Sequence, residues 1–125
     1  MLPKHIEALL DPLSYPERPV RVELKQTHIS YVFLTPEFAY KVKKPVNFGF
    51  LDFTSLDNRR FYCAEEVRLN RRLSSGIYLG VVPVTLKEGV TRMGGDGEVI
   101  DYAVKMKRIP DEAILEYLVK NETVK

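Results

Sequence analysis

The hydrophobic residues at the start of the chain follow a helical spacing. Residues 4–10, KHIEALL, place Ile6, Leu9 and Leu10 on one side of a short helix. This helix has to end before Pro12, because the residue that precedes a proline is pushed out of the helical region. We therefore expect a leading helix and a proline-rich linker over residues 1–19.

From residue 20 the period of the pattern changes to two. Hydrophobic and polar residues alternate in VRVELK, and a β-rich composition continues to residue 43. Small polar residues and a proline interrupt it near THIS (27–30) and TPEF (35–38). The pattern predicts a three-stranded antiparallel meander, followed by a packed loop over residues 46–54.

A helical pattern returns over residues 56–75. Thr54 or Ser55 is the expected N-cap, and Gly76 ends the helix. Its predicted buried side consists of Leu56, Cys63, Val67, Leu69 and Leu73. Five arginines lie mostly elsewhere on it: Arg59, Arg60, Arg68, Arg71 and Arg72. This is the one long helix that the pattern predicts.

The remaining residues indicate two more strands and the start of another helix. We interpret GGDG (94–97) as a hairpin turn between VTRM and EVIDYAVKM. The expected fold is a single α+β domain over 1–125, with a five-stranded antiparallel sheet and one long packed helix. The sheet and helix occupy residues 20–110, and a further helix begins within 111–125.

The composition excludes only a few classes of function. The chain has 125 residues, 45% of them hydrophobic, and a formal net charge of +2. A chain of this length and hydrophobic content can bury one core. The acidic residues that are interspersed with the arginines of the long helix disfavour a nucleic-acid partner. One cysteine and two histidines provide neither a disulfide framework nor a zinc site. No apolar run approaches the ~20 residues that span a bilayer. The single cysteine indicates a reducing setting, and we therefore expect a cytoplasmic protein.

The lysines of FAYKVKK raise a question about the third strand. Ala39, Lys41 and Lys43 share one face of this strand, opposite Phe38, Tyr40 and Val42. One interpretation is a solvated face with lysine stems lying along it. The other is that Glu65 or Glu66 of the long helix holds an ammonium group in place. A fixed ammonium beside a small alanine suits a nucleotide, because the alanine leaves room for the base and the lysine meets phosphate.

The order of these elements resembles the N-terminal lobe of the protein-kinase-like fold. A meander with a lysine in its third strand precedes a helix with an inward glutamate, and FAYK occupies the place of the kinase motif V-A-I-K. More closely, the chain from about Glu23 to Leu118 resembles bacterial aminoglycoside-phosphotransferase-like proteins. It is similar to the branch often fused to a P-loop kinase-type ATPase domain.

The resemblance implies a role for each matching residue. Lys41 would contact phosphate, with Lys43 as the runner-up, and Glu66 would pair with that lysine, with Glu65 as the alternative. Glu66 is favoured because Leu69 and Leu73 follow it at offsets of three and seven. Ala39 would lie over the base, and the hinge that pairs with adenine would lie in KMKRIP, at Met106, Lys107 and Ile109. The implied cofactors are ATP and magnesium.

The chain departs from the kinase pattern in two places. The first turn reads KQTHISY where a protein kinase has G-x-G-x-x-G, and the sequence stops at Lys125, before the lobe that would supply the catalytic base and the metal-binding residues. Asp52, Asp57 and Asp96 are expected in capping and turn roles. We therefore expect an ATP-binding lobe that is incomplete for phosphoryl transfer by itself, with no metal site.

The alternative is a non-catalytic interaction module. It would self-associate, or bind the absent lobe or another partner, through the face exposed between the lobes. The two readings differ in a testable way, because a nucleotide lobe predicts a Lys41 to Glu66 (or Glu65) ion pair within about 4 Å.

Overall fold

The computed structural model describes residues 2–47, 49, 51–73 and 76–108. The helices are α1 (Lys4–Ala8), the 3-10 helix η1 (Pro12–Ser14) and α2 (Leu56–Leu73). The strands are β1 (Glu23–Gln26), β2 (Ser30–Leu34), β3 (Phe38–Lys43), β4 (Tyr78–Lys87), β5 (Val90–Met93) and β6 (Glu98–Lys107). The α+β class, the antiparallel sheet and the long helix are as the sequence predicts.

Within the described residues the sheet has six strands in the order β1-β2-β3-β6-β4-β5, so the expectation of five strands is wrong. The additional strand arises at Glu88 and Gly89, which both have positive φ (52° and 78°). Such a two-residue turn matches the twist of a hairpin, and Lys87 pairs directly with Val90 across it. The sequence pattern predicts a single strand in place of β4 and β5, because it does not indicate this turn.

The GGDG segment is not the predicted hairpin turn, since β5 and β6 both pair with β4 and not with each other. Instead it crosses close to β4. The N–H of Gly94 donates to the carbonyl of Pro83 at 2.6 Å. A Cβ on Gly97 would lie 2.6 Å from the carbonyl oxygen of Leu86. These glycines permit a close approach of two backbones.

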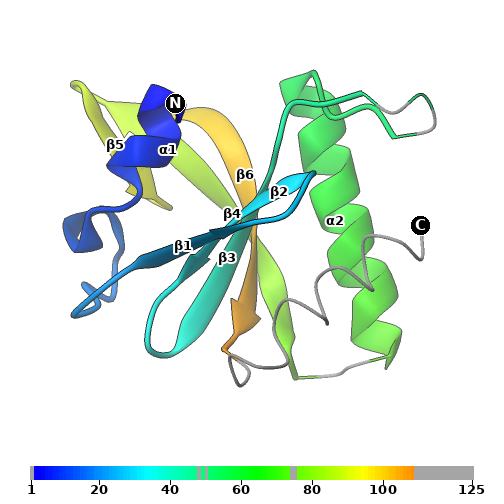
Figure 1. The fold of residues 1–125 in the computed structure, drawn as a ribbon, viewed down its shortest axis with the longest axis horizontal. Coiled ribbons are helices and arrows are strands. Elements are labelled where there is room, and N and C mark those ends of the chain that lie inside the picture. Colours follow the sequence, from blue (N-terminus) through cyan, green and yellow to red (C-terminus); the bar gives the residue numbers. More distant parts are fainter. Residues whose placement is uncertain (1, 48, 50, 74–75, 109–125) are drawn as a thin grey trace.

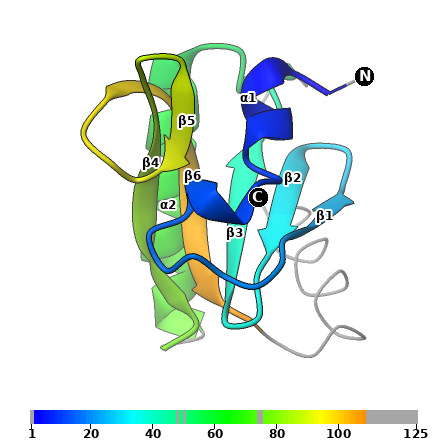
Figure 2. The same ribbon diagram turned by 90° about the vertical axis from the view of Figure 1, so that its left-hand side faces the viewer.

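Both faces of the sheet are covered. Figure 1 shows α2 on one side of the sheet and α1 on the other, and the turned view in Figure 2 agrees. The core on the α2 side contains Val32, Leu34, Ala39, Cys63, Val67, Tyr78, Val104 and Met106. The core on the α1 side contains Ile6, Leu9, Tyr15, Phe33, Tyr40, Val42, Val84, Met93 and Ala103. β3 therefore has no solvated face.

The side of α2 that faces the sheet differs from the predicted one. Ser55 caps the helix, because its Oγ accepts a hydrogen bond from the N–H of Asn58 at 3.1 Å. The buried residues Cys63, Glu66, Val67 and Asn70 follow the i, i+3, i+4, i+7 spacing of one helix face.

Leu69 is 39% exposed, so its assignment to the buried side of α2 is wrong. The side chain of Leu73 lies outside the described residues. The buried stripe contains a carboxylate and an amide, and a hydrophobic pattern cannot identify such positions.

Candidate functional site

Three charged side chains meet between β3 and α2. The Nζ of Lys41 lies 2.8 Å from Oε2 of Glu66. The Nζ of Lys43 donates a hydrogen bond to Oε1 of the same carboxylate at 2.7 Å. The side chains of Lys41 and Glu66 are 0% exposed and that of Lys43 is 2% exposed. We call these three residues the lysine–glutamate cluster.

The alternation of β3 brings both lysines to α2. Ala39, Lys41 and Lys43 face the helix, whereas Tyr40 and Val42 pack in the core on the α1 side. The interpretation of these lysines as a solvated face is therefore wrong. Buried ammonium groups are rare unless they are paired, and Glu66 provides the carboxylate that both lysines contact.

Glu65, the alternative partner, does not reach the lysines. Its carboxylate receives two hydrogen bonds from the Arg68 guanidinium, at 2.7 and 3.0 Å, on the outer surface of α2. Neighbouring residues on a helix point about 100° apart. Only one of two consecutive glutamates can therefore face the sheet, and in this chain it is Glu66.

Lys43 lies in a different environment from Lys41. Its Nζ is 5.0 Å from the centroid of the Phe53 ring, a distance at which a cation is attracted by the ring. Phe53 belongs to a small core with Ile29 and Leu51. This core joins the β1–β2 turn to the loop that leads into α2. Lys43 is therefore enclosed by three segments of the chain.

Lys41 lies closer to the predicted base-binding residues. It pairs in register with Val104 of β6, and Ala39 pairs with Met106. The structure thus brings Ala39, Lys41 and Met106 together on two adjacent strands. Consecutive residues of one strand face are separated by about 7 Å, so Lys41 is one such step from Ala39.

The predicted hinge is described only in part. Met106 is buried, and the N–H groups of Lys107 and Arg108 donate to the carbonyls of Ile77 and Glu37 at 2.9 and 3.0 Å. These two amide donors are therefore already used in backbone hydrogen bonds within the domain. Ile109 and the helix expected within 111–125 lie outside the described residues.

Cys63 is buried beside the lysine–glutamate cluster. Burial raises the pKa of its thiol from 9.0 to about 11; Glu66 and Asp101 add to this rise and the two lysines oppose it. A thiol with a raised pKa stays protonated at neutral pH and is a poor nucleophile. Cys63 therefore acts as a packing residue.

A second buried carboxylate was missed by sequence reasoning. Asp101 of β6 is 4% exposed. Its Oδ1 accepts from Nε of Arg59 at 3.0 Å and from the N–H of Tyr102 at 2.9 Å, and its Oδ2 lies 3.0 Å from Nε2 of His5. Asp101 thus connects α1 to α2 through the sheet. The available signal was an aspartate within the otherwise hydrophobic segment VIDYAV, residues 99–104.

The arginines of α2 do not form a free basic stripe. Arg59 binds Asp101 and the carbonyls of Phe53 and Thr54. Arg71 donates to the carbonyls of Tyr78 and Leu79 at the start of β4. With Arg68 bound to Glu65, three of the five have partners within the chain, which weakens the case for nucleic-acid binding.

The aspartates outside the sheet have the expected local roles. Oδ1 of Asp52 accepts from the N–H and hydroxyl of Thr54, which lowers the Asp52 pKa. Asp57 lies in the first turn of α2, and Asp96 pairs with Lys87 at 3.2 Å. In the described part of the chain, no three His, Cys, Asp or Glu side chains are grouped to hold a metal ion.

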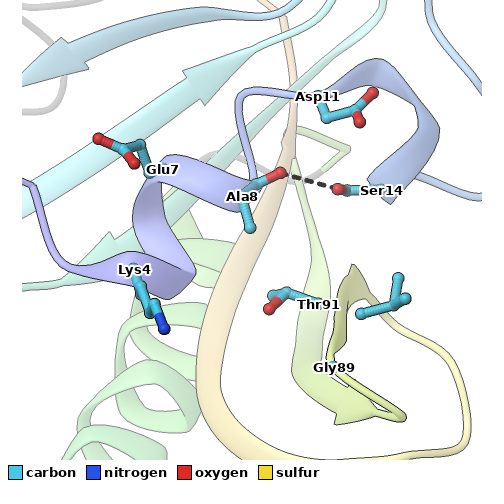
Figure 3. Close-up of a pocket in the computed structure, with 8 residues that line it drawn as sticks. Lys4, Glu7, Ala8, Asp11, Ser14, Gly89 and Thr91 are labelled. Atoms are coloured by element: carbon cyan, nitrogen blue, oxygen red, sulfur yellow. Dashed lines mark hydrogen bonds between the residues drawn. The ribbon is translucent and has the colours of Figure 1, made fainter.

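One hollow on the surface lies away from the lysine–glutamate cluster. Figure 3 shows it between α1, η1 and the β4–β5 turn. Its volume is about 460 Å³. Lys4, Glu7, Asp11 and Thr91 line it, and the Ser14 hydroxyl donates to the carbonyl of Ala8 at 2.9 Å. None of the predicted site residues contributes to it.

Among the described helices, none has the length and apolar character required to cross a membrane.

Comparisons with known proteins give relatives without an assigned activity. The chain is 33% identical over 98 residues to an uncharacterized protein of Mycobacterium bovis and to two uncharacterized proteins of Mycobacterium tuberculosis. The match covers 78% of this chain but only 18% of each relative. The chain thus spans about a fifth of the length of the curated relatives it matches. No family model matches the chain, and no solved structure does.

Proposed function

We propose that this chain is a nucleotide-binding lobe of an aminoglycoside-phosphotransferase-like, kinase-like protein, with ATP as its ligand. The observation that carries the proposal is the ion pair between Lys41 of β3 and Glu66 of α2, at 2.8 Å. An isolated buried charge is strongly unfavourable. A lysine that is paired with a carboxylate and held in a fixed position inside a domain is therefore suited to an anionic ligand.

The neighbours of Lys41 support a nucleotide as that ligand. Ala39 has the smallest side chain on the helix-facing side of β3, and the adjacent position on β6 is the apolar Met106. In this proposal the base lies against Ala39, and Lys41 binds phosphate one step further along the strand. Both residues are 0% exposed, so nucleotide binding requires the packing over them to open. The lysine would act as a point charge on the phosphate oxygens.

The proposal assigns binding, and not phosphoryl transfer, to the described residues. Phosphoryl transfer requires magnesium ligands and a group that orients the nucleophile. The described residues contain no group of three metal-ligating side chains. Those roles therefore belong, in this proposal, to residues beyond the described ones, and the acceptor is unassigned.

A titration of the whole chain with magnesium-ATP, followed by amide NMR, tests the proposal. We expect saturable shifts at Ala39, Lys41 and Met106 that disappear in Lys41→Ala. Lys105→Ala is the matched control, because Lys105 lies over the Phe38 ring at 4.1 Å and outside the cluster. Unchanged spectra at millimolar ATP, or equal loss of binding in both variants, would contradict the proposal.

A second candidate is an interaction module that self-associates or binds a protein partner. Phe61 and Leu69 of α2 are 57% and 39% exposed, and exposed apolar side chains of this kind are candidates for a contact surface. Sedimentation of wild type and Phe61→Ser distinguishes the candidates. A size that depends on concentration only in the wild type would favour the module, and a constant size in both would exclude self-association through α2.

A further inference from the structure

The two lysines of the cluster contact the same carboxylate but have different surroundings. Lys43 is bound to Oε1 of Glu66 and lies over the Phe53 ring. Lys41 is bound to Oε2 and lies between Val32 of β2 and Val104 of β6. Phe53 is 0% exposed and packs edge-on against Tyr62 of α2 at 5.1 Å. The position of Lys43 is therefore fixed by packing as well as by charge.

The segments around Lys43 are tied to one another independently of Lys41. The N–H of Lys44 donates to the carbonyl of Ile29 at 2.7 Å, and Ile29 packs in one small core with Leu51 and Phe53. Ser30 lies opposite Lys43 in the β2–β3 register. Its hydroxyl is buried and makes no hydrogen bond to any described residue. Lys43 is thus surrounded by residues of the β1–β2 turn and of the loop that leads into α2.

From these contacts we infer that Lys43 is a positioning residue for the nucleotide site, acting through Glu66. This inference rests on the proposed function. Lys43 neutralises Glu66 and fixes its carboxylate. Lys41 can then share its ammonium group with phosphate, while Glu66 keeps a buried counter-ion. A buried carboxylate is strongly unfavourable without a counter-ion, so without Lys43 the Lys41 ammonium would be held more tightly by Glu66 and would be less available to phosphate.

A double-mutant cycle on nucleotide affinity separates this role from direct binding of phosphate. The affinity for magnesium-ATP is measured for wild type, Lys43→Met, Glu66→Gln and the double variant, at a temperature where all four are folded by circular dichroism. We expect Lys43→Met to weaken binding about tenfold in the wild-type background. The same change should have less than a twofold effect in the Glu66→Gln background, because Lys43 acts only through that carboxylate.

Two results would overturn the inference. Equal weakening in both backgrounds would mean that Lys43 contacts the phosphate itself, and unchanged affinity in Lys43→Met would give it a purely structural role. Lys43→Arg serves as the conservative variant, because a guanidinium can bind the same carboxylate. It should restore most of the affinity that Lys43→Met loses.

Nitrogen-15 NMR of the lysine ammonium groups distinguishes failure of this inference from failure of the proposed function. Without nucleotide, Lys43→Met should shift the Lys41 Nζ signal, because of the two lysines only Lys41 then remains to contact Glu66. On addition of magnesium-ATP to wild type, the Lys41 signal should move while the Lys43 signal stays. No shift of either signal with ATP would refute the proposed function. An unmoved Lys41 signal in Lys43→Met would refute the positioning role, even where ATP binds.

Discussion

Lys41 and Lys43 bind different oxygens of one carboxylate, that of Glu66, at 2.8 and 2.7 Å. The carboxylate is thus the common partner of two buried ammonium groups. If either lysine is substituted, the other lysine still has Glu66 as its partner. This asymmetry makes the effects of single substitutions unequal.

Glu66→Gln should destabilise the fold more than either Lys41→Met or Lys43→Met. Removing the carboxylate deprives two buried charges of their shared partner, and a change of this kind costs about 3 to 5 kcal/mol. Each lysine variant leaves one intact lysine–glutamate pair and should lose less. Urea denaturation followed by circular dichroism gives the three free energies of unfolding.

Glu65→Gln is the matched control for that series. Glu65 is the adjacent residue on α2, and it forms a surface pair with Arg68. Exposed pairs of this kind contribute about 1 kcal/mol or less. A loss for Glu65→Gln equal to that for Glu66→Gln would show that the lysine–glutamate cluster does not contribute to stability.

Asp101→Asn should loosen the leading helix. The substitution removes the charged partner of both His5 and Arg59, and hydrogen bonds to charged groups contribute about 1.5 to 3 kcal/mol each. We expect faster hydrogen exchange of the α1 amides and a loss of about 2 kcal/mol in the free energy of unfolding. Asp96→Asn, which affects an exposed pair with Lys87, should change neither. Unchanged exchange in α1 would show that Asp101 does not hold this helix.

Gly97→Ala should destabilise the β5–β6 connection. Its Cβ would lie 2.6 Å from the carbonyl oxygen of Leu86 and 2.9 Å from Cβ of Lys87. Relieving such a clash requires backbone shifts that cost about 1 to 3 kcal/mol. Thermal unfolding provides the measurement, with Asp96→Ala in the same segment as the control. A Gly97→Ala variant as stable as Asp96→Ala would contradict the close approach of this segment to β4.

The stability of the fold should fall as the pH rises above 9. Burial raises the Cys63 pKa from 9.0 to about 11, and it also raises the pKa values of Tyr15 and Tyr40 above their ordinary 10.0. An acid whose pKa is raised in the folded state contributes stability that is fully present below its unfolded-state pKa. This stability is lost as the pH rises from the unfolded-state pKa to the folded-state pKa. For Cys63 this window is pH 9 to 11, and two pKa units correspond to about 3 kcal/mol.

Cys63→Ala isolates the contribution of the thiol. Wild type should lose stability faster than the variant between pH 9 and 11, while the decline due to the two tyrosines is common to both. Free energies of unfolding from urea titrations at pH 8, 9.5 and 10.5 give the comparison. Parallel curves for the two proteins would mean that Cys63 titrates normally in the folded chain.

The sequence allowed the α+β class, the three-stranded meander and the Lys41–Glu66 pair to be predicted. A strand alternates its faces strictly, so Lys41 had to point away from Tyr40. The argument for Glu66 was nevertheless partly wrong, because Leu69 does not share its face, whereas Asn70 does. Glu66 still contacts both lysines, as its place on the helix predicts, while Leu69 lies on a different side of α2.

Other contacts could not be predicted because they join residues that are distant in sequence. A period of two puts Lys41 and Lys43 on the same face, but it cannot indicate that both reach one carboxylate. The register shift between Val84 and Thr85 lies where β4 pairs with the start of β6, next to Asp101. Residue spacing alone contains no sign of that shift. The sequence pattern predicts β4 and β5 as one strand, because it gives no clear sign that Glu88 and Gly89 form a two-residue turn.

The contact between His5 and Asp101 has a consequence for biosynthesis. The two residues are 96 positions apart, so the leading helix is made long before its partner. At translation rates of about 5 to 20 residues per second, the ribosome needs roughly 5 to 20 s to add that length of chain. During this interval α1 lacks its carboxylate partner on β6, while Ile6 and Leu9 can already pack against the core residues of β2 and β3, which are made earlier.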